Sequence, residues 1–309
     1  MKLSIVTTAY YSSPYIREFH SRVSAVARKL VGDDYEIVFV NDGSPDDSLK
    51  ILKNLVNEDC NLKVIDLSRN FGHYKALWTG LSHAKGDRIF LIDSDLEEEP
   101  EYLELFNSKL NEIGCDVVYG IQSKRRGRFW ERWNGKLFYI VLNWLTGLGH
   151  SHDVLVARLM TRDYLDALLS FQEREIFISG LWQITGFHQV AIPVHKHSTS
   201  DTTYTFRKKI ALVINAIVSF SDIPLKAIFY VGCIILLVAM LQIAHLFILK
   251  IIFDGVVSGW ASLMASIWLL GGMIIAFLGI IGIYLSKIFL EVKRRPLSII
   301  RRIYTKSHE

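Results

Sequence analysis

The chain has 309 residues, of which 50% are hydrophobic, with 35 Lys and Arg against 31 Asp and Glu and a mean hydropathy of +0.26. This composition excludes a disordered chain, a disulfide framework and a collagenous or coiled-coil rod. The charges are unevenly distributed, because residues 227–286 contain only Lys250 and Asp254. The sequence therefore predicts a soluble domain followed by a membrane domain.

Short apolar or β-branched runs alternate with helical stretches through the first 200 residues. The predicted strands are Leu3–Ala9, Glu36–Val40, Lys63–Leu67, Arg88–Ile92, Asp116–Tyr119 and Gln189–Val194. The predicted helices are about Pro14–Val31, Asp46–Asn57, Tyr74–Ala84 and Pro100–Ile113. This alternation predicts an α/β fold with a Rossmann-like, mostly parallel sheet and helices on both faces. Ligands bind such sheets at the carboxyl ends of the strands, so the loops there are the candidates for chemistry.

Asp42 follows the predicted strand Glu36–Val40, in the turn Asn41–Ser48. Gly43 and Pro45 are typical turn residues, but the turn does not explain a carboxylate at the strand tip. That carboxylate is suited to accept hydrogen bonds from the edge of a base or from a ribose hydroxyl. On its own an Asp-Gly pair indicates only a turn.

A stronger signal follows the predicted strand Arg88–Ile92, where Asp93 and Asp95 are two residues apart. Two like charges held close together are costly unless a positive charge compensates them. A divalent cation shared between carboxylates and substrate phosphates would do so. The alternative is a pair of helix-capping aspartates ahead of Glu97–Glu101, because acids are favoured at helix N-termini. The position after an apolar strand, with Asp42 upstream, favours the metal interpretation.

Several segments together resemble the family 2 glycosyltransferases, which have a GT-A fold. They are Val40–Ser48, Ser68–Gly72, Gly86–Asp87 and Asp93–Glu101. With Arg158–Met160, two apolar segments and the ending Gly282–Pro296, the chain is similar to the polyprenyl-phosphate glycosyltransferases. These include dolichyl-phosphate mannose synthases and bacterial undecaprenyl-phosphate glucosyl- and aminoarabinosyl-transferases. The resemblance runs from Leu3 to about Arg302.

The resemblance implies a binding site for a nucleotide-sugar donor. Thr8 and Tyr10 fall where the family borders the nucleotide base, and Asp42 falls on the acid that contacts the base. Arg69, within the segment Ser68–Gly72, is a further expected donor-binding residue.

The implied reaction transfers a sugar from a nucleotide diphosphate, with UDP favoured, to a polyprenyl phosphate such as undecaprenyl phosphate. Asp93 and Asp95 fall on the motif that meets ribose and metal, and Asp95 is the expected ligand of Mg²⁺ or Mn²⁺. The metal would neutralise the leaving diphosphate. The lipid phosphate is largely ionised at neutral pH, so no strong general base is needed. Direct displacement would invert the anomeric centre, and the product would serve the modification of cell-envelope glycans.

Some positions depart from the family pattern. Glu97 replaces a glutamine, Gln122 stands near a usual arginine, and the stretch around Val156 is altered. The lysine expected beside the donor pyrophosphate is absent at Thr203, although His195, Lys196 and His197 lie just upstream and are candidates to replace it. These departures cluster where the donor sugar is expected and leave the identity of that sugar open.

Two segments, Ala227–Ile252 and Ala261–Lys287, are each long enough to cross a bilayer. Seven basic residues from Lys287 onward put the C-terminus in the cytosol by the positive-inside rule. The first ten residues do not read as a signal peptide, so the N-terminus is expected in the cytosol as well. The sequence thus predicts a multi-pass protein of the cytoplasmic (inner) membrane. Glycines in the second segment permit a homo-oligomer.

Aromatic and basic residues recur at helical spacing over about residues 129–146, and residues 206–226 repeat the pattern. Both are predicted to be amphipathic helices at the membrane surface, with core-facing helices as the alternative. Arg126, Arg132 and Lys136 are the candidates to bind the lipid phosphate, since arginine forks fit phosphate well. A nucleic-acid partner is not expected, because the cluster lies beside tryptophans and ahead of two membrane segments.

The predicted organisation has four parts. They are a cytosolic GT-A domain (1–205), a second interfacial helix (206–226), two membrane helices (227–287) and a basic cytosolic tail (288–309). Two alternatives are open. One is a non-catalytic membrane scaffold derived from such an enzyme. The other is a processive polysaccharide synthase, which would need a Gln-x-x-Arg-Trp motif and further spans that the chain lacks.

Overall fold

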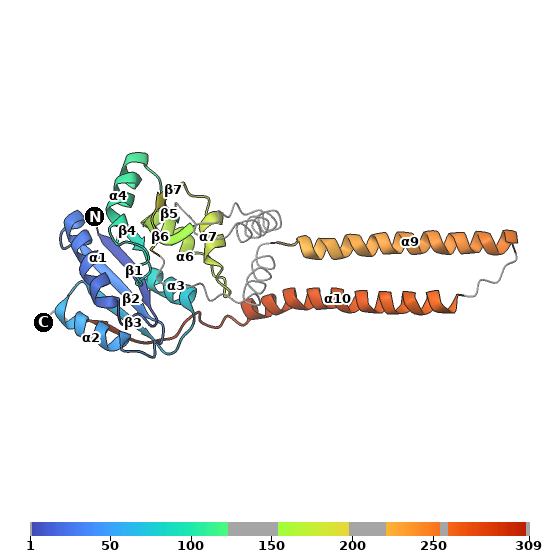
Figure 1. Cartoon of the computed structure of the whole chain (residues 1–309), viewed down its shortest axis with the longest axis horizontal. Coiled ribbons are helices and arrows are strands. Elements are labelled where there is room, and N and C mark those ends of the chain that lie inside the picture. Colours follow the sequence, from blue (N-terminus) through green and yellow to red (C-terminus); the bar gives the residue numbers. More distant parts are fainter. Residues whose placement is uncertain (1, 123–153, 198–220, 254–258, 307–309) are drawn as a thin grey trace.

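The computed structural model describes residues 2–122, 154–197, 221–253 and 259–306. Figure 1 shows an α/β domain from which two long helices project side by side. The predicted helix over 129–146 and most of the one over 206–226 lie outside the described residues, so both stay predictions.

An eight-stranded sheet forms the centre of the domain. Its strands are parallel to their neighbours, except that β6 and β8 run antiparallel. The order across the sheet is β7 (Gln189–Val194), β5 (Val117–Gln122), β6 (Val154–Thr161), β4 (Arg88–Leu91), β1 (Leu3–Ala9), β2 (Tyr35–Asn41), β3 (Leu62–Leu67) and β8 (Ile300–Thr305). The expected mostly parallel, Rossmann-like sheet is confirmed.

Helices cover both faces of this sheet, as the buried β-branched runs predict. One face packs against α1 (Ile16–Val31), α2 (Ser48–Glu58) and α4 (Tyr102–Ile113). The other packs against α3 (His73–His83), α6 (Arg162–Leu169) and α7 (Ile178–Ile184). All seven residues of β1 and all seven of β2 are buried, which is why β1 and the centre of β2, Ile37–Val40, read as apolar or small-residue runs rather than as alternating ones.

The register of the parallel strands brings four strand ends to one edge of the sheet. Ala9 at the end of β1 pairs with Asn41 at the end of β2, which pairs in turn with Asp66 of β3. On the other side of β1, Val6 pairs with Leu91 at the end of β4. The loops after β1, β2, β3 and β4 therefore meet at this edge, where the sequence predicts the site.

Strands β6 and β8 were not anticipated. β6 lies between β4 and β5 and carries Arg158, which is 1% exposed and whose pKa burial lowers to about 10. β8 lies within the stretch that the sequence predicts as a basic tail. It pairs with β3, with Val64 opposite Tyr304, so the segment after the second long apolar helix adds a strand to the edge of the sheet.

The two projecting helices are α9 (Ile223–Phe253) and α10 (Trp260–Val292) (Figure 1). At 1.5 Å per residue they are about 46 and 50 Å long, more than the roughly 30 Å of a hydrocarbon core. Each contains a stretch long and apolar enough to cross a membrane, Ile223–Gln242 and Ser266–Val292. Their described apolar side chains are largely exposed, as suits contact with lipid.

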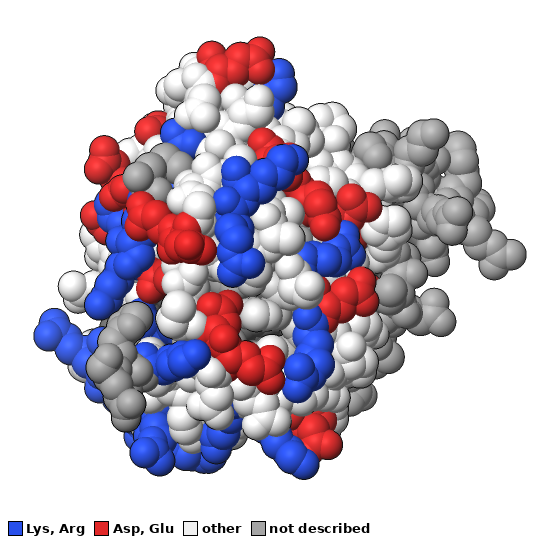
Figure 2. Space-filling view, turned by 90° about the vertical axis from the view of Figure 1, so that its left-hand side faces the viewer, with Lys and Arg blue, Asp and Glu red and all other residues white. Residues whose placement is uncertain are grey.

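The face of the domain turned away from α9 and α10 carries charges of both signs in close alternation (Figure 2). Arg22 of α1 pairs with Glu101 at 2.6 Å, and Lys29 of α1 pairs with Glu104 of α4 at 2.7 Å. Interspersed charges of this kind are typical of a solvated surface.

Candidate active site

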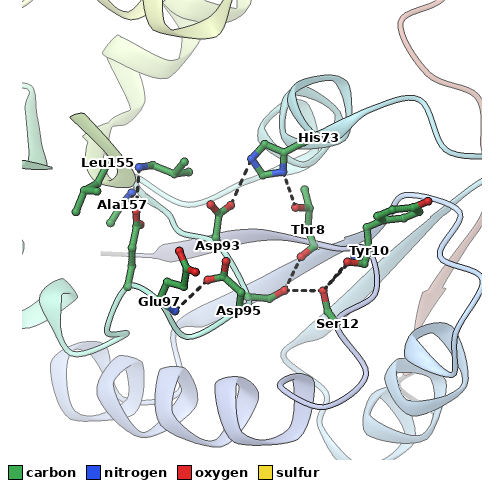
Figure 3. A network of polar contacts seen from close by, with 12 residues as sticks. Thr8, Tyr10, Ser12, His73, Asp93, Asp95, Glu97, Leu155 and Ala157 are labelled. Carbon is green, nitrogen blue, oxygen red and sulfur yellow. Dashed lines mark hydrogen bonds and ion pairs between the residues drawn. The ribbon is translucent and has the colours of Figure 1, made fainter. Parts of the chain in front are cut away.

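Asp93 and Asp95 lie in the loop after β4, at the edge where four strand ends meet (Figure 3). Oδ1 of Asp95 accepts a hydrogen bond from the backbone N–H of Glu97 at 3.0 Å, in a tight turn that places Leu96 at a positive φ of 59°. The hydroxyl of Ser94, between the two acids, donates to the carbonyl of Thr8 at 2.7 Å. The loop after β4 is therefore fixed to the loop after β1.

His73, the first residue of α3, connects the same two loops from the opposite side (Figure 3). Its Nδ1 lies 3.3 Å from the hydroxyl of Thr8, and its Nε2 lies 3.4 Å from Oδ1 of Asp93. Burial lowers the pKa of His73, against the opposing charges of Asp42 and Asp95. The sequence analysis missed His73, because a histidine that begins a helix carries no signal of its distance from Asp93.

Asp42 lies at the tip of β2 and is 2% exposed. Its two carboxylate oxygens accept backbone N–H groups from the loop after β3, Phe71 at 2.7 Å and Gly72 at 3.0 Å. Burial raises the pKa of Asp42, and these two hydrogen bonds act against the rise. The carboxylate thus joins the ends of β2 and β3, a structural role that the sequence did not indicate.

The remaining donor-site residues differ in exposure. Thr8 is buried at the end of β1, and Tyr10 just after it has a side chain 46% exposed. Arg69 is exposed on the loop after β3, where its guanidinium donates to the carbonyl of Asn70 and lies 4.2 Å from the ring centre of Phe71. The structure therefore brings Thr8, Tyr10 and Asp42 to one edge, with Arg69 turned onto its own loop.

A second group of charges lies immediately after Asp95. Glu98, 1% exposed, accepts the backbone N–H groups of Val156 at 3.2 Å and Ala157 at 2.7 Å, and so ties this loop to β6. Glu97 pairs with Nζ of Lys196 at 2.9 Å. Glu97 and Val156, two of the positions that depart from the family pattern, therefore both make contacts that the structure describes. Thr203, a third such position, lies outside the described residues.

Burial and mutual repulsion make this edge unfavourable for anionic carboxyl groups. The pKa of Asp93 is raised to about 7, chiefly by burial and then by the charge of Asp95. The pKa of Glu98 is also raised to about 7, chiefly by burial and then by the charge of Asp93. Burial also raises the pKa of Asp95; the hydrogen bond from the backbone of Glu97 acts against this rise, and the charge of the Glu97 side chain adds to it. Lys196 acts in the opposite direction on all three. A further cation at the edge would therefore be stabilised.

Asp93 and Asp95 fit a divalent cation. Oδ1 of Asp93 is buried and accepts no hydrogen bond, since Nε2 of His73 at 3.4 Å makes a charge contact only, so this oxygen has capacity left for a ligand. Among the described residues no group of three His, Cys, Asp or Glu side chains could hold a metal by itself. Carboxylate oxygens are the ligands that Mg²⁺ or Mn²⁺ prefer, with further oxygens taken from substrate phosphates and water, so the donor chemistry of Asp93 and Asp95 is of the right kind.

The residues expected to bind the acceptor phosphate, Arg126, Arg132 and Lys136, lie outside the described residues. Gln122 ends β5, on the far side of β6 from the paired aspartates. The structure therefore describes the expected donor side of the site and leaves the acceptor side to prediction.

Known proteins with similar sequences cover nearly the whole chain. A protein of Mycobacterium tuberculosis named as a glycosyltransferase is 49% identical over 98% of this chain and 89% of its own length. The prophage bactoprenol glucosyl transferase homolog of Escherichia coli K12 is 32% identical over 98% of this chain and 99% of its own. The bactoprenol glucosyl transferase of Shigella phage SfII is 31% identical over 98% of each.

The fold is similar to that of a solved mannosyltransferase of Pyrobaculum calidifontis in complex with GDP-Man and Mn²⁺. The TM-score is 0.50 over 94% of this chain and 84% of that one, at 16% identity. The sequence model described as glycosyl transferase family 2 matches residues 4–169, which include the strand-end loops that carry Thr8, Asp42, Asp93 and Asp95. The chain is a glycosyltransferase that belongs to family 2.

Proposed function

We propose that this enzyme transfers a sugar from a nucleotide diphosphate sugar, with UDP favoured, to a polyprenyl phosphate, with undecaprenyl phosphate favoured. The transfer takes place at the cytosolic face of the membrane, requires Mg²⁺ or Mn²⁺ and inverts the anomeric centre. The product is a lipid-linked sugar used to modify cell-envelope glycans.

The observation that carries this proposal is the combination of Asp93 and Asp95 at a strand-end edge with two long apolar helices on the same chain. The paired carboxylates suit a nucleotide sugar and its metal, and the helices suit an acceptor that stays in a bilayer. The names of the relatives from Escherichia coli and Shigella phage SfII, which span the same length, support a bactoprenol acceptor.

In the proposed mechanism the donor lies across the ends of β1, β2 and β4. Thr8 and Tyr10 border the nucleotide, and Asp42 keeps the loop after β3 in place through Phe71 and Gly72. Asp93 and Asp95 would hold a divalent cation, which would supply positive charge to stabilise the leaving diphosphate. Lys196, close enough to lower the pKa of both aspartates, adds positive charge on the same side.

The acceptor phosphate approaches from the membrane side. It is largely ionised at neutral pH, so one of its oxygens attacks the anomeric carbon while the bond to the diphosphate breaks. Arg126, Arg132 and Lys136 are proposed to hold this phosphate. The basic residues that follow α10 favour a cytosolic C-terminus, so α9 and α10 cross the membrane as a hairpin and leave the domain in the cytosol.

The proposal is tested with membranes that contain the full chain, undecaprenyl phosphate and a panel of radiolabelled nucleotide sugars. We expect one donor to transfer its label to the lipid extract, and we expect a chelator or Asp95→Asn to prevent it. The anomeric configuration of the purified product reports inversion. Absence of label from the lipid extract with every donor, in membranes where the chain is present and folded, would contradict the proposal.

A further inference from the structure

The C-terminal end of α10 contacts the α/β domain (Figure 1). Lys287 is the first charged residue after Asp254, so it marks the point where the apolar stretch of α10 ends. Its Nζ lies 3.4 Å from a carboxylate oxygen of Glu175, in the loop between α6 and α7. A lysine at the end of an apolar helix is typical of the boundary between lipid and water. The domain is therefore joined to α10 at the level where the helix leaves the apolar region.

Glu291 lies one turn further along α10, about 6 Å away, and contacts the same loop. One of its carboxylate oxygens accepts the backbone N–H of Arg174 at 2.7 Å. Residues four apart share one face of a helix, so Lys287 and Glu291 both face the loop between α6 and α7. These two residues of α10, with Arg174 and Glu175 of the loop, are called the α10 dock below.

The same end of α10 also holds the start of α9. The hydroxyl of Tyr284 donates to the backbone carbonyl of Ser221 at 2.8 Å, two residues before α9 begins at Ile223. Tyr284 precedes Lys287 by about one turn of the helix. Both long helices and the domain are thus connected to one another over a short length of α10.

The connection from α10 to β8, residues 293–299, is itself bonded to the domain. The hydroxyl of Ser298 lies 2.6 Å from the hydroxyl of Thr79 in α3. The carbonyl of Ile299 accepts the backbone N–H of Ser68 at 2.9 Å. Because both ends of this segment are held, the domain is not suspended from α10 by a loose tether.

The contacts of the α10 dock are polar and partly exposed. The side chain of Lys287 is 21% exposed and that of Glu175 is 41% exposed, so their ion pair adds little to the stability of the fold. Their position between a long apolar helix and the domain has another consequence, because they limit how the domain can turn relative to α10. A connection that fixes orientation raises the rate at which a tethered site meets its substrate.

We propose that Lys287 and Glu291 are positioning residues for the lipid acceptor. Through the α10 dock they hold the strand-end edge of the domain at one height and orientation above the bilayer, where the phosphate of a membrane lipid reaches it. The assignment rests on the proposed function, which supplies the lipid acceptor. Both residues act through the loop between α6 and α7 and not on a substrate.

The test uses the full-length protein in phosphatidylcholine vesicles that contain undecaprenyl phosphate. We expect Glu291→Ala to lower kcat/KM for the lipid about fivefold, because one hydrogen bond that orients the domain is lost. The affinity for the nucleotide sugar, measured by titration, is expected to change less than about twofold, because the donor edge is distant from the dock. Glu291→Gln keeps an oxygen that can accept the N–H of Arg174, so both quantities should stay within about twofold of the wild type.

An exchange of charges tests the ion pair. Lys287→Glu places a like charge opposite Glu175 and is expected to lower kcat/KM for the lipid about tenfold. The double variant Glu175→Lys with Lys287→Glu restores opposite charges and should recover kcat/KM to within about threefold of the wild type. Lys293→Gln is the control for loss of a basic charge, because the described contact of the Lys293 side chain is with Phe289 of its own helix. It should change neither quantity.

The height of the domain is measured separately, by energy transfer from a fluorophore on Cys60 to a dye on lipid headgroups. Cys60 is exposed between α2 and β3 and Cys115 is buried, while Cys233→Ser removes the exposed cysteine of α9. We expect the transfer efficiency of Glu291→Ala and of Lys287→Glu to differ from that of the wild type. Glu291→Gln should match the wild type.

The outcomes are distinguishable. If lipid kcat/KM or transfer efficiency is unchanged in both Glu291→Ala and Lys287→Glu, the assignment is overturned and the proposed function stays in place. An equal loss of donor affinity, or no recovery in the double variant, also overturns it, because the contacts would then act through the donor edge or through the fold. A wild-type protein that transfers no sugar to the lipid overturns the proposed function, and the role of the dock in transfer with it.

Discussion

Nε2 of His73 lies 3.4 Å from Oδ1 of Asp93, so the first residue of α3 contacts the first acid of the pair after β4. The other ring nitrogen lies 3.3 Å from the hydroxyl of Thr8. A single imidazole thus spans two loops of the candidate site, and 43% of its side chain is exposed. Its neutral form, favoured by the lowered pKa, can donate one hydrogen bond and accept another.

We expect His73→Ala to lower kcat/KM for the donor about fivefold to tenfold, since one net hydrogen bond of about 1 kcal/mol is lost. The loss arises because Asp93 and Thr8 are no longer held together. Initial rates with varied donor and saturating lipid measure it. His83→Ala is the matched control, because His83 ends the same helix and its ring bonds, among the described residues, only to Thr79 and Ser82 of that helix. If His73→Ala has the same kcat/KM for the donor as the wild type, His73 makes no contribution to donor use.

We expect Asp95→Asn to lower turnover by about 10²–10³ while the protein stays folded, because the charge that holds the metal is lost and the shape of the turn is kept. Oδ1 of Asp95 accepts the N–H of Glu97, and the asparagine oxygen can do the same. Turnover is measured over a range of Mg²⁺ and Mn²⁺ concentrations, with melting temperature as the control for folding. Near wild-type turnover in the variant, or full wild-type activity in excess chelator, would refute the metal role.

Arg132→Ala is expected to raise the KM for lipid acceptor and to leave donor binding nearly unchanged. Loss of one charge-assisted contact to phosphate costs about 1.5–3 kcal/mol, which is roughly a tenfold to hundredfold effect. Kinetics with varied lipid at fixed donor, followed by the reverse experiment, separate the two substrates. If donor binding is abolished and the dependence on lipid is unchanged, the basic cluster serves the other substrate.

Arg301 of β8 is expected to support the loop that precedes α3. Its guanidinium donates to the carbonyl of Ser68 at 2.6 Å and lies 3.5 Å from the carboxylate of Asp66, which is 1% exposed. Because the arginine itself is more than half exposed, we expect Arg301→Ala to cost only about 1 kcal/mol, or ~2–4 °C in melting temperature. We expect donor affinity to fall about 2–5-fold, because the loop after β3 loses this support. Arg302→Ala, at the exposed neighbouring position, is the control and should leave both measurements unchanged.

Glu36 stabilises the domain near neutral pH, and this stabilisation is lost in acid. Burial alone would raise the pKa of this carboxyl, but hydrogen bonds from Ser4 and the backbone of Lys85 and the charge of Lys63 outweigh it and lower the pKa. A group whose pKa is lower in the folded state stabilises the fold above its unfolded pKa of 4.5, and the stabilisation disappears as the pH falls through the folded value. Glu36→Gln should therefore lower stability at pH 7 by about 1–3 kcal/mol.

The pH dependence provides the check on Glu36. Melting temperatures of wild type and Glu36→Gln should converge as the pH is lowered from 7 through the acid range, because the wild-type carboxyl is then protonated. Glu18→Gln, on the exposed face of α1, is the control for the loss of a surface carboxylate. A constant difference between wild type and Glu36→Gln at every pH would show that the ionised carboxylate is not the stabilising form.

Sequence reasoning located those parts of the fold whose signal is local. Leu3–Ala9 and Gln189–Val194 were predicted with the bounds that the structure gives, because each is a short apolar run between clear breakers. Asp93 and Asp95 were recognised because an apolar strand ends directly before them. The two apolar segments were recognised from length and absence of charge alone.

The elements that were missed depend on contacts that are distant in sequence. β6 carries the buried Arg158, which interrupts its apolar pattern and is stabilised by stacking near Trp182 and by backbone carbonyls of its own strand. β8 reads as a basic tail because Arg301 and Arg302 dominate its six residues, and only its pairing with β3 makes it a strand. The role of Asp42 in holding Phe71 and Gly72 likewise requires the folded loops.

The pairing of β8 with β3 sets an order of events during synthesis. β3 and its neighbours leave the ribosome early, but the strand that covers the outer edge of β3 follows α10 in the chain. Until Ile300–Thr305 emerges, the N–H and C=O groups along that edge have no strand partner and are open to pairing with another chain. Both apolar helices must therefore be made before the outer edge of β3 can be covered, so the last step in folding the α/β domain comes after α9 and α10 have been synthesised.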